Sequence, residues 1–356
     1  SPLASFAPMR AASARAAKRR KRGLRSSRAG VTCAGGRTGK VSVREDIAML
    51  IRIRRDWEIP EREATPESVF LDRRAFLGGA AALGFSIARP ARAQEGAPRN
   101  PAFTLDRDLT PEAVSSRHNN YFDFGSTKRI FAAAEALQTS PWKVKIDGLV
   151  EAPFEMDVAD LIKAMPVEER LYRHRCVETW AMAAPWTGFP LAALIKKAQP
   201  KPEAKYVAFT SFHDPKVAPT QRQSWYPWPY REALTLAEAT NELAFMVTGA
   251  YGKPLHKSFG APLRLATPWK YGFKSAKAIT RVSFVAQRPK TFWEDVQGDE
   301  YGFWANVNPD VPHARWSQAE DRLIGSNEIR PTQIFNGYAA QVAALYKGLE
   351  REKLWM

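Results

Sequence analysis

The sequence predicts a mixed α+β fold, and three observations support this prediction. Segments with a strand pattern outnumber segments with a helical pattern. The connections between these segments are long. Strand and helix patterns do not alternate as they do in a doubly wound parallel sheet. We therefore expect mixed sheets with short helices.

The first expected strand covers residues 142–148, where apolar and polar residues alternate up to a turn at Gly148. This alternation indicates a strand with one face toward solvent. Later segments with a strand pattern predict further strands at residues 206–212, 243–248, 262–266 and 278–286.

The first expected helix covers residues 157–165 and stops at Pro166, because proline does not continue a helix. Residues 191–197 repeat the helical spacing and end near Pro200. In the last part of the sequence, residues 336–349 predict an amphipathic helix.

Positive charge is concentrated in the first part of the sequence. The formal net charge is +16, and residues 1–93 contribute 20 Lys and Arg against 8 Asp and Glu. Residues 94–356 hold 33 basic and 29 acidic residues, which excludes a uniformly basic nucleic-acid-binding fold. Residues 1–44 lack apolar periodicity, so we expect a disordered basic extension and no nucleic-acid partner. Salt-dependent DNA binding by this segment is the alternative.

The segment before residue 94 has the pattern of a twin-arginine signal peptide. Arg73 and Arg74 precede a weakly apolar stretch of 14 residues, and a small-residue cleavage pattern ends at Ala93. Cleavage after Ala93 would leave residues 94–356 as a single domain. The twin-arginine route carries folded proteins, often with a cofactor already inserted. The sequence therefore predicts a periplasmic cofactor enzyme.

Cys176 is the only cysteine of the predicted mature chain, and its surroundings allow three interpretations. Arg173, His174 and Arg175 are expected to favour the thiolate, which acts as a nucleophile or a metal ligand. A small buried apolar residue is the plainest alternative. A cysteine protease or thiol reductase is less favoured, because no protease motif surrounds the histidines and no second cysteine is available to resolve a sulfenic acid. Ligation to a metal that accepts soft ligands fits the chemistry best.

Six long motifs follow one another in the chain. They are Tyr172–Glu178, Pro185–Leu191, Gly260–Leu265, Pro268–Lys274, Glu300–Pro309 and Phe335–Tyr338. Together they resemble the motifs of the molybdopterin-dependent protein-methionine-sulfoxide reductases, the MsrP (YedY) family, from residue 67 onward. The resemblance implies a sulfite-oxidase-like molybdopterin-binding domain that holds one Mo-molybdopterin. It also implies that Cys176 is the metal ligand and the catalytic residue.

The same resemblance assigns the pterin-binding positions. They are Asn119, Phe122, Asp123, Ser211, Arg264, Ser275, Ala276 and Lys277. Arg264 and the turn at residues 275–277 offer a cation and backbone N–H groups to a phosphate, and Asn119 offers an amide to the ring edge. Phe259 stands where the family commonly has Asn, so a side-chain hydrogen bond is not expected there. Candidates for a pocket wall, with core packing as the default, are Trp180, Trp186, Trp225, Trp228, Trp269 and Tyr271.

The resemblance also implies a reaction and its partners. The enzyme would reduce protein-bound and free methionine sulfoxide to methionine by oxygen-atom transfer to the Cys-ligated molybdenum. Electrons would come from the quinone pool through a membrane haem b subunit (MsrQ-like), and oxidised periplasmic proteins would be the substrates. Two alternatives stay open. One is a sulfite dehydrogenase of the same fold, which would need several arginines around a dianion, and the other is a secreted, non-catalytic binding protein.

Overall fold

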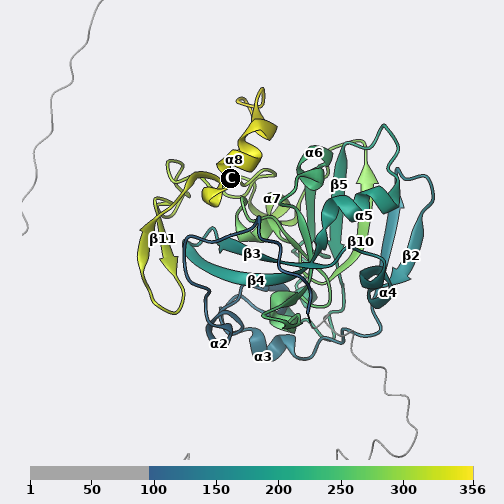
Figure 1. Cartoon of the computed structure of the whole chain (residues 1–356), viewed down its shortest axis with the longest axis horizontal. Coiled ribbons are helices and arrows are strands. Elements are labelled where there is room, and N and C mark those ends of the chain that lie inside the picture. Colours follow the sequence, from purple (N-terminus) through teal and green to yellow (C-terminus); the bar gives the residue numbers. More distant parts are fainter. Residues whose placement is uncertain (1–95, 356) are drawn as a thin grey trace, which may run out of the picture. The chain divides into compact units, whose positions relative to one another are not determined.

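The computed structural model describes residues 96–355, whose strands form two sheets (Figure 1). The first sheet has five strands in the order β2-β1-β10-β5-β6. They are β1 (Lys143–Gly148), β2 (Phe154–Asp157), β5 (Tyr206–Ser211), β6 (Arg231–Thr235) and β10 (Ile279–Val285). β1 and β10 run parallel, and the other neighbouring strands run antiparallel. The sheet is therefore mixed, as expected.

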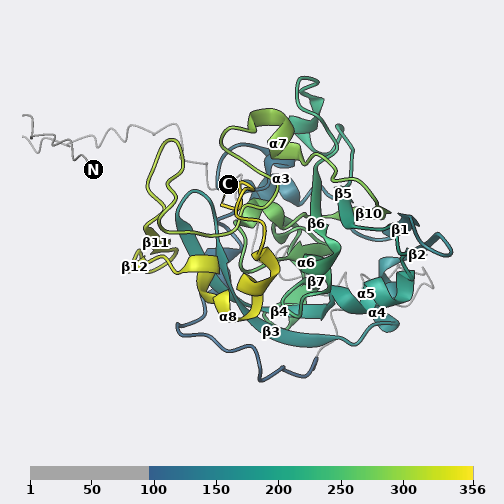
Figure 2. The same cartoon turned by 90° about the horizontal axis from the view of Figure 1, so that it is seen from above.

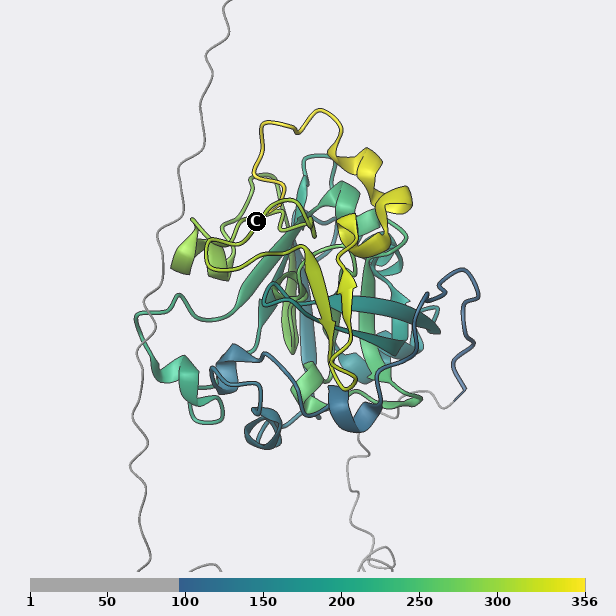
Figure 3. The ribbon, with the colours of Figure 1, turned by 90° about the vertical axis from the view of Figure 1, so that its left-hand side faces the viewer.

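The second sheet has seven strands, with β4 at its centre. They are β3 (Glu168–Arg175), β4 (Trp180–Pro190), β7 (Phe245–Ala250), β8 (Lys253–Pro254), β9 (Arg264–Ala266), β11 (Glu320–Leu323) and β12 (Ile329–Pro331). β4 pairs antiparallel with β3 and β7, and parallel with β11. The β11–β12 hairpin, the yellow-green and yellow arrows of Figure 3, thereby joins the C-terminal part of the chain to the start of β4.

The helices are short and lie outside the two sheets (Figure 2). The α-helices are α2 (Glu112–Ser115), α3 (Phe131–Ala134), α4 (Val158–Lys163), α5 (Leu191–Ala198), α6 (Leu236–Thr240), α7 (Phe292–Gln297) and α8 (Ala339–Val342). The 3-10 turns are η3 (Phe122–Phe124), η4 (Pro219–Arg222), η5 (Lys257–Phe259), η6 (Gly272–Lys274), η7 (Ile334–Gly337) and η8 (Ala343–Tyr346). Within residues 96–355, no helix has the length and apolar character that a membrane crossing requires.

Local patterning identified most of the first sheet correctly. In β1 the side chains of Val144 and Ile146 are buried while those of Lys143 and Lys145 are exposed, as the alternation predicts. The other expected strands correspond to β5, β7, β9 and β10, and the expected helices at 157–165 and 191–197 correspond to α4 and α5. α4 begins after Asp157, whose carboxylate accepts a hydrogen bond from the N–H of Ala159.

The expected C-terminal helix at residues 336–349 is wrong. The chain instead forms three short pieces, η7, α8 and η8. Phe335, Asn336 and Gly337 all have positive φ angles, between 52° and 85°, which interrupts right-handed helix at this point. The Asn336 amide donates to the carbonyl of Pro268 (2.8 Å), so a tertiary contact holds the interruption in place.

The two longest strands, β3 and β4, were missed. β4 is buried over ten of its eleven residues and contains Pro185 and Gly188, so it shows no alternation and little β-propensity. β3 carries three arginines, two of them buried, which gives it a polar sequence. The predictions for residues 1–93, including the basic extension, the signal peptide and the cleavage after Ala93, lie outside the described residues.

Candidate active site

A cavity of about 280 Å³ lies where segments from both sheets meet. Of the residues predicted from the sequence, eight line it. They are Asn119, Phe122, Asp123, Cys176, Ser211, Arg264, Ser275 and Lys277. These residues are separated by up to 158 positions in the sequence, so only the folded chain brings them together. Their roles in cofactor binding stay predictions, but their placement around one cavity is what those roles require.

Ala276 is the predicted residue that does not line the cavity. It is buried, and its carbonyl accepts a hydrogen bond from the N–H of Leu265 (2.9 Å). Its own N–H donates to the carbonyl of Lys274 (3.2 Å), and the N–H of Ser275 donates to that of Gly272. Both amides are therefore engaged within the protein. The turn offers the cavity the side chains of Ser275 and Lys277 rather than the expected amides of Ser275 and Ala276.

Cys176 follows the last residue of β3 and begins the turn into β4. Its N–H donates to the carbonyl of Trp180 (2.9 Å), and the N–H of Thr179 donates back to the carbonyl of Cys176 (3.1 Å). Thr179 has a φ of 70°, a left-handed conformation that makes the turn tight. Because strand side chains alternate, His174 and Cys176 point toward the cavity while Arg173 and Arg175 point away from it.

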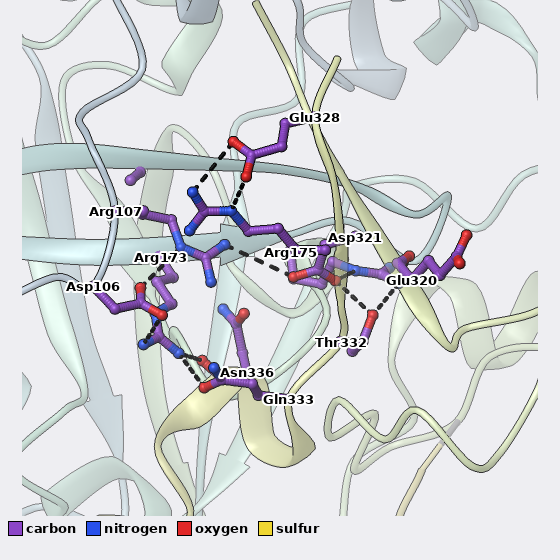
Figure 4. A network of polar contacts seen from close by, with 12 residues as sticks. Asp106, Arg107, Arg173, Arg175, Glu320, Asp321, Glu328, Thr332, Gln333 and Asn336 are labelled. Atoms are coloured by element: carbon purple, nitrogen blue, oxygen red, sulfur yellow. Dashed lines mark hydrogen bonds and ion pairs between the residues drawn. The ribbon is translucent and has the colours of Figure 1, made fainter. Parts of the chain in front are cut away.

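The two arginines beside Cys176 form a network on the opposite face of β3 (Figure 4). Arg175 is fully buried, and its Nε lies 2.5 Å from Oδ1 of Asp321 in β11. Arg173 forms an ion pair with Asp106 (3.0 Å) and donates to Oε1 of Gln333 (2.7 Å). Their positive charges are thus used in structural contacts and not directed at the sulfur.

This arrangement corrects the expectation that the arginines favour a thiolate. Burial raises the pKa of Cys176 to about 12, and the nearby negative charge of Glu178 adds to this effect. Arg175 makes only a small contribution in the opposite direction. The free thiol is therefore neutral at physiological pH, whereas a metal-bound thiol is deprotonated by the metal itself.

The polar neighbours of the sulfur are Asn120 and Glu178, and Lys128 lies behind them as the ion-pair partner of Glu178. The Asn120 amide nitrogen lies 3.2 Å from Cys176 Sγ and 2.8 Å from Oε2 of Glu178. Oε2 of Glu178 lies 3.8 Å from the sulfur and 2.5 Å from Nζ of Lys128. Burial raises the pKa of Glu178, but hydrogen bonds from Lys128 and Asn120 outweigh it, so the net shift is downward and the carboxyl group is ionised. A negatively charged group therefore stands beside the sulfur.

Arg264, which is buried, and Lys277, which is partly buried, line another part of the cavity. Arg264 donates to the carbonyls of Phe259 (2.8 Å) and Leu265 (3.1 Å), and Lys277 donates to those of Asn120 (2.7 Å) and Ser258 (3.1 Å). Among the described residues, neither forms an ion pair with a carboxylate. Burial lowers the pKa of Arg264 to about 10 and lowers the pKa of Lys277 well below its ordinary value. Such a pair is suited to an anionic group.

The cavity also contains buried polar atoms that have no hydrogen-bond partner in the described part of the protein. They are His118 Nε2, Asn119 Oδ1, Tyr121 OH, Trp180 Nε1 and Ser211 Oγ. An unsatisfied buried polar group costs roughly 1–3 kcal/mol, so a cluster of them indicates a polar ligand. The carboxyl group of Asp123 also lines the cavity; its Oδ1 accepts a hydrogen bond from Gln221 (2.7 Å), and burial raises its pKa to about 6. The cavity therefore fits a molybdopterin cofactor. Its amide, hydroxyl and phenol groups suit the edge of the pterin ring, its cations suit the phosphate, and its thiol suits the metal.

Several cavity residues escaped the sequence reasoning. Tyr121, His174 and Glu178 lie within two positions of predicted residues, so proximity to those residues was the available signal. Trp293 comes from α7 and was marked by no local pattern, whereas Tyr301, in the loop after α7, lies in the motif Glu300–Pro309 but was not assigned to the site. Phe259 lines the cavity, and its backbone carbonyl binds Arg264. Of the six aromatic candidates for a pocket wall, Trp180 is the one among the lining residues of the cavity.

Comparisons with known proteins show which family part of the chain is similar to. Residues 131–293 match the sequence model of the family described as "Oxidoreductase molybdopterin binding domain". The matched segment contains Cys176, Ser211, Arg264 and the turn at residues 275–277. Fold and site thus define a molybdopterin-binding oxidoreductase domain. This result confirms the expected fold class, an α+β molybdopterin-binding domain with mixed sheets, and the expected cofactor, Mo-molybdopterin.

One solved structure with detectable similarity is the sulfane dehydrogenase SoxCD from Paracoccus pantotrophus. Its sequence is 16% identical, the match covers 71% of this chain and 67% of that chain, and the TM-score is 0.39. The similarity to a molybdopterin-binding oxidoreductase domain therefore rests on residues 131–293.

Proposed function

We propose that the protein reduces methionine sulfoxide, protein-bound and free, to methionine at a molybdenum ligated by Cys176. When bound, the cofactor supplies oxygen-atom transfer and two-electron redox chemistry. Cys176 holds the metal, and the cations Arg264 and Lys277 hold the pterin phosphate. The Glu178 carboxylate lies beside the sulfur and is ionised, and the ammonium group of Lys128, its ion-pair partner, would be the nearby proton donor.

The observation that carries the proposal is the charge around Cys176. A sulfite dehydrogenase must bind a dianion near the metal, which calls for several arginines. In this protein Arg173 and Arg175 point away from the cavity, and the carboxylate of Glu178 lies beside the sulfur. Lys128 offsets the charge of Glu178 (2.5 Å), so a dianion finds no net positive charge beside the sulfur, whereas a neutral sulfoxide needs none. The charge distribution therefore favours a sulfoxide over sulfite.

The electron donor and the location belong to the same proposal. A membrane haem b subunit fed by quinol would supply the electrons, and the protein would act in the periplasm after export by the twin-arginine pathway. These parts rest on the sequence resemblance and on Arg73 and Arg74. Replacing both arginines by lysine should retain the protein in the cytoplasm, and export of the doubly substituted protein would contradict the proposed route.

The reaction can be tested with molybdenum-loaded protein and an artificial low-potential electron donor. The wild type should reduce both forms of methionine sulfoxide and should not oxidise sulfite with an artificial acceptor. Cys176→Ala should keep the fold but lose turnover, and Ser326→Ala, which truncates an exposed side chain outside the cavity, is the control and should keep turnover. Sulfite oxidation without sulfoxide reduction would establish the dehydrogenase alternative. Turnover by pterin-loaded Cys176→Ala would overturn the role of Cys176.

A further inference from the structure

A row of four aromatic side chains leads from the protein surface into the cavity. It consists of Trp225, Tyr226, Phe122 and Trp293, and we call it the aromatic row. The ring centroids are 6.0 Å apart for Trp225 and Tyr226, 5.0 Å for Tyr226 and Phe122, and 5.0 Å for Phe122 and Trp293. Phe122 and Trp293 line the cavity, whereas Trp225 is 74% exposed. The row therefore connects solvent with the site.

The inner part of the aromatic row is fixed by a buried ring behind it. Phe292, the first residue of α7, is fully buried and packs against Tyr226 (6.3 Å), Phe122 (6.2 Å) and Trp293 (5.4 Å between centroids). Thr291 and Glu294 form a capping box that fixes the start of α7. Rings held in this way lose little conformational freedom when a ligand binds.

Trp225 differs from the other members of the aromatic row because packing does not explain its position. It is the most exposed large apolar side chain among the described residues. Its turn is nevertheless ordered by hydrogen bonds, since the N–H of Tyr226 donates to the carbonyl of Gln223 (3.2 Å) and the N–H of Trp228 donates to that of Tyr226 (2.9 Å). An indole presented to solvent on a defined turn, next to rings that lead to a site, is characteristic of a binding surface.

We propose that the aromatic row binds the polypeptide segment that flanks a methionine sulfoxide, and that Trp225 contacts residues which a free amino acid does not reach. This inference rests on the proposed function. The row extends through three steps of 5.0 to 6.0 Å, whereas an extended chain advances about 3.3–3.6 Å per residue. A single methionine sulfoxide in the cavity is too short to touch Trp225 as well. A peptide with roughly four or five residues on one side of the sulfoxide is long enough.

The chemistry of the aromatic row suits such an occupant. Aromatic faces bind aliphatic, proline and sulfur-containing side chains without requiring one sequence, which a repair enzyme for many proteins needs. Continuity with the cavity identifies the occupant as the substrate chain, because the inner two rings belong to the site where the sulfoxide is reduced. Trp225 is therefore a specificity residue for protein-bound sulfoxide.

The experiment uses the molybdenum-loaded full chain, an artificial electron donor, free methionine sulfoxide and peptides of three to eleven residues with a central methionine sulfoxide. In the wild type, KM should fall once the peptide is long enough to reach Trp225. Trp225→Ala should raise KM for the long peptides roughly three- to tenfold, as expected for one aromatic contact, and leave kcat and all values for free methionine sulfoxide unchanged. Trp225→Phe should restore most of the affinity. Ile329→Ala, which removes another exposed apolar side chain (53% exposed), is the matched control and should change nothing.

A binding measurement separates affinity from turnover. Calorimetric titration of the oxidised holoenzyme with the long peptide, without any reductant, should show the same increase in Kd for Trp225→Ala. An equal effect on free methionine sulfoxide, or no effect on any substrate, would overturn the inference. Slower electron delivery from the membrane subunit with unchanged peptide kinetics would also overturn it, because Trp225 would then contact that partner. If the wild type reduces no sulfoxide of any length, the proposed function itself fails.

Discussion

Removing the carboxylate of Asp321 should destabilise the protein far more than removing a surface carboxylate. The side chains of Arg175 and Asp321 are 0% and 2% exposed, and their ion pair spans 2.5 Å. Oγ1 of Thr332 donates to the same Asp321 oxygen (2.6 Å), so Asp321 is the acceptor for two buried donors. Asp321→Ala leaves a buried guanidinium without its counter-charge, which costs about 3–5 kcal/mol. For a domain of this size, that corresponds to a decrease in Tm of about 10 °C.

The assay compares thermal and urea unfolding of Asp321→Ala with those of Glu155→Ala. Glu155 pairs with Lys143 at 3.3 Å, but both side chains are well exposed, so its loss should cost less than about 1 kcal/mol. The double variant Arg175→Leu/Asp321→Leu should recover much of the stability, because no unpaired charge remains. It should still lose molybdenum, since Arg175 also donates to the carbonyl of Cys176. Equal costs for Asp321→Ala and Glu155→Ala would refute the reasoning.

Three further predictions concern the cavity and the second sheet. Burial raises the pKa of Asp123 from 3.8 to about 6, so the stability that its neutral form contributes is present below pH 4 and is lost as pH rises through 6. In cofactor-free protein, the free energy of unfolding of Asp123→Asn should therefore rise relative to that of the wild type as pH increases from 4 to 6, by up to about 3 kcal/mol. A difference between the two proteins that does not change with pH would contradict this. Gly188→Ala would place a Cβ 2.0 Å from the carbonyl oxygen of Met246 in β7, so urea unfolding should show a loss of roughly 1–3 kcal/mol, and wild-type stability would refute the close approach. Glu178→Gln removes the negative charge beside the sulfur, so sulfite should inhibit sulfoxide reduction with a roughly tenfold lower inhibition constant, and an unchanged constant would show that this carboxylate does not repel anions.

The parts of the fold that follow from the sequence are those in which a local pattern and its burial agree. In β1, lysines alternate with Val144 and Ile146, and the structure keeps each on the expected face. β4 escaped prediction because it pairs with three strands and is buried on both faces, which replaces alternation with a run of small and apolar residues. The pairing partners that make this run a strand lie far away in the sequence.

In the candidate site, too, only some features could be predicted from the sequence. The identity of Cys176 as the central residue follows from its solitary position, and the motifs around it indicate the family. The role of its neighbours does not follow, because adjacency in sequence is not proximity in a strand, where side chains at positions 175 and 176 point to opposite faces. The charge that reaches the sulfur comes from Glu178, across the turn, and from Lys128, which is contributed by a distant loop.

The hydrogen bonds that hold the turn after Cys176 in place have a consequence for biosynthesis. The indole N–H of Trp316 and the amide of Gln318 each donate to the carbonyl of Val177 at 2.8 Å. The turn that holds Cys176, the proposed metal ligand, is therefore completed by a segment about 140 residues downstream, which a ribosome synthesises many seconds later. A nascent chain that already displays Cys176 cannot yet position it, so cofactor insertion has to await release of nearly the whole polypeptide.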